Sequence, residues 1–383
     1  MLTTPVAVCG SVDFRPAFRS LGWFRERFPE VPVLACTATA TPHVVKDILT
    51  TLKIKSCRIG SFDRKNIYYR VAYKDTLDAF SPRGAVGHLT DFISKCHRKA
   101  EKNLQQCSGI VYVHKREDTQ MLAAAISKVT GVRAAAYHGG LKKADRTRVQ
   151  DLWVSGEIKV AIATIAFGMG VDLAHVRYVI HWSLAKSVEA FYQESGRAGR
   201  DGQPAQSLLY YAKQDASKFE FLARQRKSRK DTDNDKSVDR ALDALGKMVD
   251  YAITPHCRRE YLLRHFGEKE THPKKVCAGT CDFCNNPSKV KDNISRAMGS
   301  MNSVFKVASG APLFNASSDR FALAEESPDE KVTKVGDLCV TSCDDFEGSW
   351  SPVAKPSRKR PDHFRSASET LAKYEVSCIT SNR

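Results

Sequence analysis

The sequence lacks any long apolar run. No stretch of roughly 18 or more consecutive apolar residues occurs, whereas about 20 are needed to cross a bilayer as a helix. Met1 to Gly10 also lacks the basic start and the apolar length of a secretory signal. The chain therefore predicts no membrane partner. No internal repeat is evident along the 383 residues, which argues against a repeat architecture.

A paired cysteine pattern is also missing from most of the chain. The sequence has 12 cysteines, and all but one group of four are scattered. In a chain of this length without a secretion signal, scattered cysteines indicate reduced thiols in a cytosolic or nuclear protein rather than a disulfide scaffold.

Acidic residues are too few to balance the basic ones. The chain has 60 Lys and Arg against 43 Asp and Glu, which gives a formal net charge of +17. A surplus of this size favours a polyanionic partner such as a nucleic acid. The alternative is a solvated basic surface or a basic tail without a partner.

Short apolar runs alternate with helical patterns through the middle of the chain. Runs of this kind, each bounded by Gly or polar residues, predict a parallel α/β sheet that is covered on both faces and doubly wound. Helical stripes cover Glu117–Val129 and Lys142–Trp153. The expected strands are Tyr68–Tyr73, Gly109–Val113, Val132–Tyr137, Val160–Ala163, Tyr178–His181 and Gln206–Tyr211.

The segments around this sheet differ in composition. Residues 1–60 hold one strand-and-helix unit, with a strand at Val31–Ala35 and a helix from Pro42, and one such unit cannot form a domain alone. A polar, basic stretch at 216–236 is followed by helices at Ala241–Tyr251 and Arg258–Phe266. We therefore expect a lobe at 61–215, a helical subdomain at 216–290 and a remnant of another lobe at 1–60.

Residues 291–383 lose periodicity and are rich in Ser, Asp, Pro and Lys. This composition predicts a disordered tail. The cluster Lys355–Pro361 within it has the composition of a nuclear import signal, although such clusters also arise by chance in basic tails.

Four cysteines form the sharpest local pattern. Their spacing is C-x19-C-x3-C-x2-C, and four thiolates suit a tetrahedral zinc ion that leaves no open catalytic position. The first is expected at a helix start, where backbone N–H groups stabilise a thiolate. The alternative is a chance cluster of buried thiols. The predicted zinc ligands are Cys257, Cys277, Cys281 and Cys284.

The stretch Ala161–Gly202 predicts a surface that handles phosphates. It contains two short apolar strands around a Gly-rich loop, followed by a helix from Ser187 and by two arginines, Arg197 and Arg200. Glycines allow close backbone approach to a phosphate, and arginine offers a rigid fork of donors. The bound group would be a nucleotide, a nucleic acid or both.

Several motifs resemble those of superfamily-two helicases. Gln193–Gly202 (QESGRAGRDG) is similar to their sixth motif, Ala163–Asp172 (ATIAFGMGVD) to the fifth and Thr37–Thr41 (TATAT) to the third. Asp13–Pro16 resembles the end of an aromatic-rich loop. Together with Tyr137–Leu141 and the cysteine quartet, the set resembles the RecQ family of ATP-dependent DNA helicases over residues 12 to about 290, and it is most similar to the type-five branch.

The resemblance implies ATP bound with Mg²⁺ between two RecA-like lobes, and structural Zn²⁺. It implies that Arg200 reaches the γ-phosphate as an arginine finger beside Arg197, with Gln193 coupling that site to its lobe. Asp172 would bond the ribose, close to Gly170. DNA, single-stranded or forked, would lie across the lobes and be held by backbone contacts. The implied DNA-facing residues are Thr164, His114, Lys115, Arg116, Gly139 and Gly140.

Two motifs of the family are missing from this sequence. Neither a G-x-x-x-x-G-K-[S/T] loop nor a DExH box is found in the chain, although these hold the phosphates, Mg²⁺ and water. The sequence is therefore interpreted as N-terminally truncated and inactive alone, and as part of a nuclear 3′–5′ DNA helicase of recombination and repair. The alternative is a non-enzymatic DNA-binding or strand-annealing protein. An RNA helicase is disfavoured by the quartet and by the form of the sixth motif.

Overall fold

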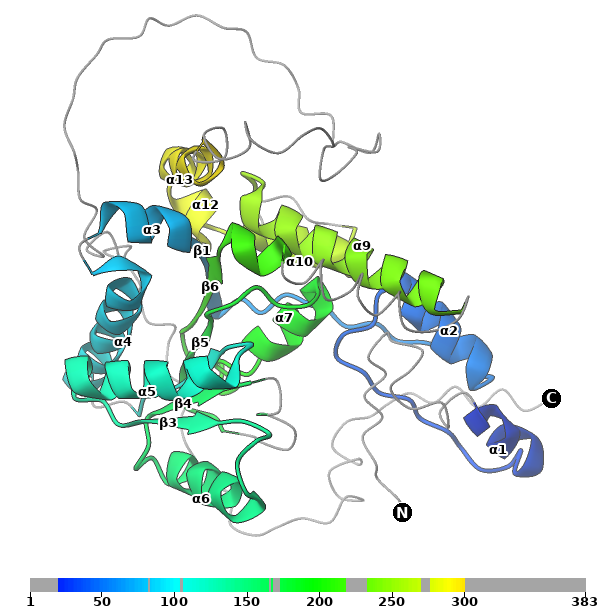
Figure 1. Cartoon of the computed structure of the whole chain (residues 1–383). Coiled ribbons are helices and arrows are strands. Elements are labelled where there is room, and N and C mark those ends of the chain that lie inside the picture. Colours follow the sequence, from blue (N-terminus) through cyan, green and yellow to red (C-terminus); the bar gives the residue numbers. More distant parts are fainter. Residues whose placement is uncertain are drawn as a thin grey trace, which may run out of the picture. The chain divides into compact units, whose positions relative to one another are not determined.

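The computed structural model describes residues 20–81, 83–103, 106–164, 167, 173–217, 233–269 and 276–299. Within them, six strands form one sheet in the order β1-β6-β5-β2-β4-β3 (Figure 1). Every neighbouring pair is parallel, so the predicted α/β fold and the six strands predicted for this sheet are confirmed. The strands are β1 (Ile67–Tyr73), β2 (Ser108–Tyr112), β3 (Ala134–Tyr137), β4 (Val160–Ala163), β5 (Val176–His181) and β6 (Ala205–Tyr211).

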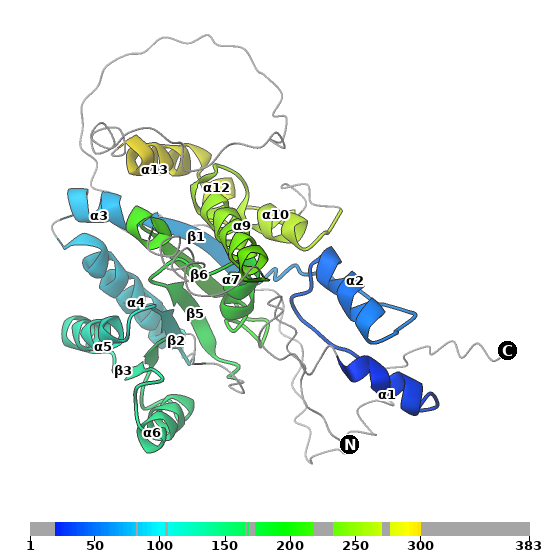
Figure 2. The same cartoon turned by 45° about the vertical axis from the view of Figure 1, so that its right-hand side comes forward.

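Helices cover both faces of the sheet, which is why the strands read as continuous apolar runs. On one face, α4 and α5 pack on side chains such as Val111, and on the other face α6 packs Trp153 near Ile110. At the β1 end of that second face, α7 and α9 pack around Tyr69 (Figures 1 and 2). No helix in the described part of the chain is apolar enough over the length needed to span a bilayer. The helices are α1 (Gly22–Arg27), α2 (Pro42–Thr51), α3 (Lys74–Phe80), α4 (Gly84–Lys102), α5 (Arg116–Thr130), α6 (Lys143–Val154), α7 (Val188–Ser195), α9 (Asp233–Ile253), α10 (Arg258–His265), α12 (Asp282–Asn285) and α13 (Pro287–Gly299).

A glycine is required at one point of the central strand β2. Gly109 lies beside Tyr178 of β5, and a Cβ at this position would lie 1.9 Å from the Tyr178 ring. The Trp153 indole of α6 also donates a hydrogen bond to the Gly109 carbonyl, at 3.3 Å. Any side chain at position 109 would therefore displace the buried tyrosine.

One predicted strand and one predicted segment boundary are wrong. Val31–Ala35 is not a strand, and Leu34 is 84% exposed. A strand needs a partner for its backbone groups, and no described segment pairs with this run. Residues 291–299 belong to helix α13 rather than to the tail, because Val290, Ile294 and Ala297 form one buried stripe. The rest of the expected tail, including the basic cluster at Lys355–Pro361, lies outside the described residues.

Acid should weaken the attachment of α4 to the sheet. The imidazole Nε2 of His97 lies 3.0 Å from the Tyr178 hydroxyl, and the side chain is 8% exposed. Burial, with a smaller contribution from the charge of Lys159, lowers the pKa of His97 from 6.5 to about 4. Between these values the unfolded chain binds more protons than the folded one, so stability is lost as the pH falls from 6.5 towards 4. This one group is expected to lower the free energy of unfolding by roughly 1–2 kcal/mol at pH 5.

Urea unfolding at pH 7.5 and pH 5.0 measures this contribution. The variant His97→Gln cannot titrate, so its loss of stability between the two pH values should be smaller than that of the wild-type chain by this amount. Equal losses in both chains would contradict the assignment. All other titrating groups are shared by the two chains and cancel in the comparison.

Candidate metal centre and phosphate-facing edge

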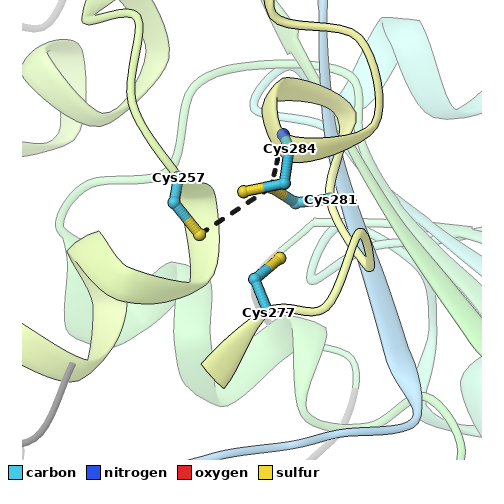
Figure 3. Close-up of side chains that lie close together, drawn as sticks. All are labelled: Cys257, Cys277, Cys281 and Cys284. Atoms are coloured by element: carbon cyan, nitrogen blue, oxygen red, sulfur yellow. Dashed lines mark hydrogen bonds between the residues drawn. The ribbon is translucent and has the colours of Figure 1, made fainter. Parts of the chain in front are cut away.

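The structure brings together the four cysteines that the sequence predicts as zinc ligands. Their Sγ atoms all lie within 4.8 Å of one another, and Figure 3 shows the sulfurs directed towards a shared centre. The Sγ atoms of Cys257 and Cys281 are 3.9 Å apart. Zn–S bonds of about 2.3 Å in a tetrahedron place sulfurs roughly 3.8 Å apart. The donor set and its spacing therefore fit a structural zinc ion with four protein ligands.

Local backbone geometry explains how the ligands converge. Cys257 caps the N-terminus of α10, where its Sγ accepts a hydrogen bond from the Glu260 N–H at 3.5 Å. Cys281 caps α12 in the same way, through the Cys284 N–H at 3.4 Å. Between Cys277 and Cys281 the chain turns through Ala278 and Gly279, which have φ values of 46° and 79°. Helix N-termini and this tight turn thus present four sulfurs to one point.

The four sulfurs cannot all carry negative charge without a cation. Hydrogen bonds from the Cys257, Cys281 and Cys284 thiols lower the pKa of Cys277. The hydrogen bond with Cys277 in turn raises the pKa of Cys257. One thiolate is therefore stabilised at the expense of its neighbours. A bound dication would stabilise all four thiolates, because zinc binds the deprotonated form.

The loop from Cys277 to Asp282, here named the cysteine loop, also covers the edge strand β1 of the sheet. The Tyr69 N–H donates to the Thr280 carbonyl at 3.4 Å, and the Val71 N–H donates to Asp282 Oδ2 at 2.8 Å. The Ile67 carbonyl accepts a hydrogen bond from the Arg259 guanidinium at 2.8 Å. The edge groups that would otherwise lack partners are thus bonded to the residues around the metal ligands.

Two consecutive arginines follow the first ligand, and both are buried. Arg258 is 0% exposed and Arg259 is 1% exposed. Arg258 Nε donates to Asp282 Oδ1 at 3.0 Å, and its Nη1 donates to the Tyr251 carbonyl at 2.7 Å. Burial opposes ionisation, but the nearby Asp282 carboxylate raises the pKa of Arg258. Both guanidinium groups therefore remain charged and fasten the cysteine loop to the lobe.

The predicted DNA-facing residues lie at one edge of the sheet. Those at 114–116 follow β2, those at 139–140 follow β3, and Thr164 follows β4. These three strands are neighbours in the sheet, so their carboxyl ends meet, where open α/β sheets place ligands. A Cβ at Gly140 would lie 3.1 Å from Arg116 Nη1, so the two segments are in contact.

These residues are not equally available to a ligand. Lys115, Arg116, Gly139 and Gly140 are exposed. His114 is half-buried, and its Nε2 lies 2.6 Å from the Leu184 carbonyl. Because that nitrogen is already bonded, His114 holds the loop after β5 in place. Burial lowers its pKa, which further favours the uncharged ring.

The predicted nucleotide-facing residues lie after β5. Ser187 caps α7 by accepting a hydrogen bond from the Ala190 N–H at 3.2 Å. The helix ends at Ser195, so it carries Gln193, whereas Arg197 and Arg200 lie in the turn that follows it. Gln193 and Arg200 are exposed and Arg197 is half-buried. Gly170 and Asp172 lie outside the described residues.

Sequence reasoning missed two side chains that support this turn. Arg64 donates to the Gly196 carbonyl at 2.8 Å and to the Ala198 carbonyl at 2.9 Å. Asn66 donates to the Gly199 carbonyl at 2.7 Å. Both residues precede β1, more than a hundred positions earlier in the chain. In the sequence, both belong to a short polar run that precedes a buried strand. This pattern does not indicate which distant groups the two side chains contact.

A buried polar group lies beneath the carboxyl edge of the sheet. His181, at the end of β5, has its Nε2 2.8 Å from Glu194 Oε2 of α7. Its ring stacks on Tyr112 at the end of β2, with centroids 5.4 Å apart. The Tyr112 hydroxyl donates to the Phe167 carbonyl at 3.2 Å. These contacts join the ends of two strands to the helix that precedes the arginines.

Two family models match this chain. The helicase conserved C-terminal domain matches residues 88–202, and the RecQ zinc-binding domain matches residues 213–285. The parallel sheet with its arginine-bearing turn therefore defines the class: the C-terminal lobe of a helicase.

Three similar proteins narrow this class. The chain is 40% identical to mouse ATP-dependent DNA helicase Q5, over 73% of this chain and 28% of the relative. It is 37% identical to ATP-dependent DNA helicase RecQ of Haemophilus influenzae, over 77% and 44%. It is 38% identical to the Schizosaccharomyces pombe helicase hus2/rqh1, over 71% and 19%. The chain thus spans less than half of each of these relatives. It belongs to the RecQ family of superfamily-two helicases.

Proposed function

We propose that this chain supplies the second RecA-like lobe and the zinc module of an ATP-dependent 3′–5′ DNA helicase. One observation carries the proposal. The exposed cations Lys115 and Arg116 follow the carboxyl end of β2, and the arginine-bearing turn lies at the amino ends of β5 and β6, where the Gly199 N–H donates to the Val176 carbonyl, in a chain with a RecQ-type cysteine quartet. A DNA strand would then bind at the carboxyl edge of the sheet, and a nucleotide would bind beside the arginine-bearing turn.

The nucleotide site would be served by three residues. Arg200, exposed after α7, would act as an arginine finger on the γ-phosphate of ATP bound with Mg²⁺. Such a group stabilises charge that develops in phosphoryl transfer and contributes about 10³-fold or more in rate. Arg197 would lie beside it, and Gln193 would couple the site to its lobe. Asp172 and Gly170 are proposed for the ribose side.

The zinc module would have a structural role. Cys257, Cys277, Cys281 and Cys284 would hold Zn²⁺ with no open position, which excludes a bound catalytic water. The ion would fix α10 and α12 against the edge strand β1, through the hydrogen bonds of the loop around the ligands. In this role zinc sets the stability of the lobe rather than its chemistry.

We propose further that the chain alone does not hydrolyse ATP, because its sequence contains neither a phosphate-cradling G-x-x-x-x-G-K-[S/T] loop nor a DExH box. On its own it would bind DNA, and a strand-annealing or DNA-holding role is the second candidate. The exposed cations Lys115 and Arg116 at the carboxyl edge of the sheet favour DNA binding in either case. Eukaryotic relatives named as DNA helicases support a nuclear role in recombination and repair.

Removing two cations from the edge should weaken DNA binding. Lys115→Ala/Arg116→Ala is expected to lower the affinity of the purified chain for single-stranded DNA by about tenfold. It should also reduce the slope of log K against log [salt] by about 1.4, since each phosphate contact on a single strand contributes about 0.7. Fluorescence anisotropy titrations at several salt concentrations measure both quantities.

The charge-matched control is Lys128→Ala/Arg133→Ala, which removes two exposed cations from the opposite end of α5 and the loop before β3. This variant should retain the wild-type slope. If both double variants lose affinity equally, binding follows net charge and the proposed interface is wrong. An RNA of equal length serves as competitor, and preference for RNA would contradict the assignment to DNA.

A further inference from the structure

A short segment ahead of the sheet lies between the metal centre and the arginine-bearing turn. Residues 61–67, here named the connecting segment, lead into β1. On one side they contact Arg259 of α10, and on the other side they contact the turn Gly196–Gly199. The segment is therefore one bonded path between two sites that are far apart in the sequence.

Towards the turn, Arg64 makes most of the contacts. Its Nη1 donates to the Gly196 carbonyl at 2.8 Å, and its Nη2 donates to the carbonyls of Ala198 and Gly199 at 2.9 and 3.3 Å. Asn66 adds a bond to the Gly199 carbonyl. A planar guanidinium can hold several carbonyls in fixed relative positions, whereas an ammonium cannot. The backbone that carries Arg197 and leads to Arg200 is thus held mainly by the Arg64 side chain, which makes three of these four bonds.

Towards the metal centre, Arg259 makes the contacts. Its Nη1 donates to Asp63 Oδ1 at 2.5 Å and to the Arg64 carbonyl at 2.8 Å. Its Nη2 donates to the Ile67 carbonyl at 2.8 Å and to Thr280 Oγ1 at 3.0 Å. Arg259 follows the ligand Cys257 by two positions, and Thr280 directly precedes the ligand Cys281. The guanidinium therefore joins the backbone beside two ligands to the backbone of Arg64.

Aromatic side chains also connect the segment to α10 and α7. The Phe62 ring stacks on Phe266, at the end of α10, with centroids 4.7 Å apart and an interplanar angle of 13°. The Phe62 carbonyl accepts a hydrogen bond from the Tyr192 hydroxyl of α7 at 2.6 Å. The connecting segment is consequently fixed to both elements by packing as well as by hydrogen bonds.

We propose that Arg64 is a positioning residue that couples the metal centre to the turn Gly196–Gly199. When the ligands are held by a metal ion, Arg259 is fixed, the Arg64 backbone is fixed with it, and the Arg64 side chain holds the turn. Loss of the metal would therefore release Arg259 and loosen the turn Gly196–Gly199. Coupling between two sites is a reciprocal free energy, so the order of the turn also favours metal retention. The importance of the coupling for a motor rests on the function proposed above.

Hydrogen–deuterium exchange of the full chain tests the coupling directly, with zinc or with a chelator as the variable. The amides of Gly196, Arg197, Ala198 and Gly199 all donate backbone hydrogen bonds and so report on the turn. In the wild-type chain, chelation should raise exchange in peptides covering 193–202 by about tenfold, as expected when local protection is lost. Arg64→Met with zinc bound should show a similar rise, and chelation should then add little.

Three further measurements keep the test decisive. Peptides from β2 and α5 should retain their protection, and if chelation unfolds them, Cys284→Ser replaces the chelator because Cys284 is the least buried ligand. Arg64→Lys should fall between the wild type and Arg64→Met. Arg83→Met, which removes an exposed arginine paired with Asp91, should behave as the wild type.

The proposal is overturned if chelation raises exchange of the turn equally in the wild type and in Arg64→Met, or leaves it unchanged in both. A chelation effect at least threefold larger in the wild type supports it. Exchange needs neither ATP nor DNA, so this result is independent of the helicase assignment. Failure of the DNA-binding experiment would leave the coupling measurement unaffected.

Discussion

Loss of metal from the four-cysteine site is expected to unfold the module that contains α10 and α12 and to destabilise the sheet edge. Structural zinc contributes about 10 kcal/mol or more of apparent binding free energy at pH 7. Without it, four thiols remain close together, and the loop that bonds Tyr69 and Val71 of β1 loses its anchor. Cys281→Ser should produce the same loss, because this ligand is 0% exposed and belongs to the loop itself.

Metal content by mass spectrometry and thermal unfolding by circular dichroism measure this effect. The wild-type chain should carry one zinc ion per molecule, and Cys281→Ser should carry substantially less and unfold at a lower temperature. Cys36→Ser, which alters an exposed thiol outside the cluster, is the control and should match the wild type. A metal-free wild-type chain of unchanged stability would contradict the structural role.

Truncation of Arg259 is expected to have the second largest effect. Arg259→Met should lower the free energy of unfolding by about 3–5 kcal/mol, the usual result of removing one partner from a buried ion pair. The remaining Asp63 carboxylate is 10% exposed, and the carbonyls of Arg64 and Ile67 lose their donor. Buried groups left without partners carry the full desolvation cost.

Urea unfolding measures this loss, and α10 offers a matched control. Arg264→Met removes a half-exposed arginine that pairs with Glu260, and a pair of this kind contributes only about 0.5 kcal/mol. Asp63→Asn added to Arg259→Met should restore part of the lost stability, because it removes the orphaned charge. Equal losses for Arg259→Met and Arg264→Met would show that the buried pair does not hold the module to the lobe.

The strands could be predicted because both faces of a covered parallel sheet are buried, so each strand is a continuous apolar run in the sequence. β2, β4 and β5 are almost wholly buried and therefore appear as apolar runs. The helix that follows Ser187 was readable from its cap. By contrast, Val31–Ala35 shows that an apolar run alone does not make a strand. Its local sequence is suitable, but no described strand lies beside it to pair with its backbone.

Other features carried a signal that was overlooked. Leu89, Phe92 and Ile93 of α4 and the buried stripe of α13 have helical spacing, so both helices were within reach of a periodicity argument.

Some residues of the candidate sites could also be predicted from the sequence, and others could not. The cysteine quartet and the arginine turn are short patterns whose chemistry is local. The structure brings the four sulfurs together and places Gln193 on α7, with Arg197 and Arg200 in the turn that follows it. The supporting residues Arg64 and Arg259 contact backbone carbonyls that are distant in the sequence. A carbonyl is present at every residue, so no sequence pattern identifies which one a guanidinium will bind. Such contacts emerge only once the topology of the sheet is known.

Under the proposed function, this chain provides one half of a nucleotide site, in which Arg200 serves a phosphate that other motifs must cradle. DNA-stimulated ATP hydrolysis by the purified chain, in a preparation shown to bind single-stranded DNA, tests this most directly. The predicted result is DNA binding with no ATP turnover above the background rate. Turnover comparable to that of an intact relative such as mouse helicase Q5 would contradict the account.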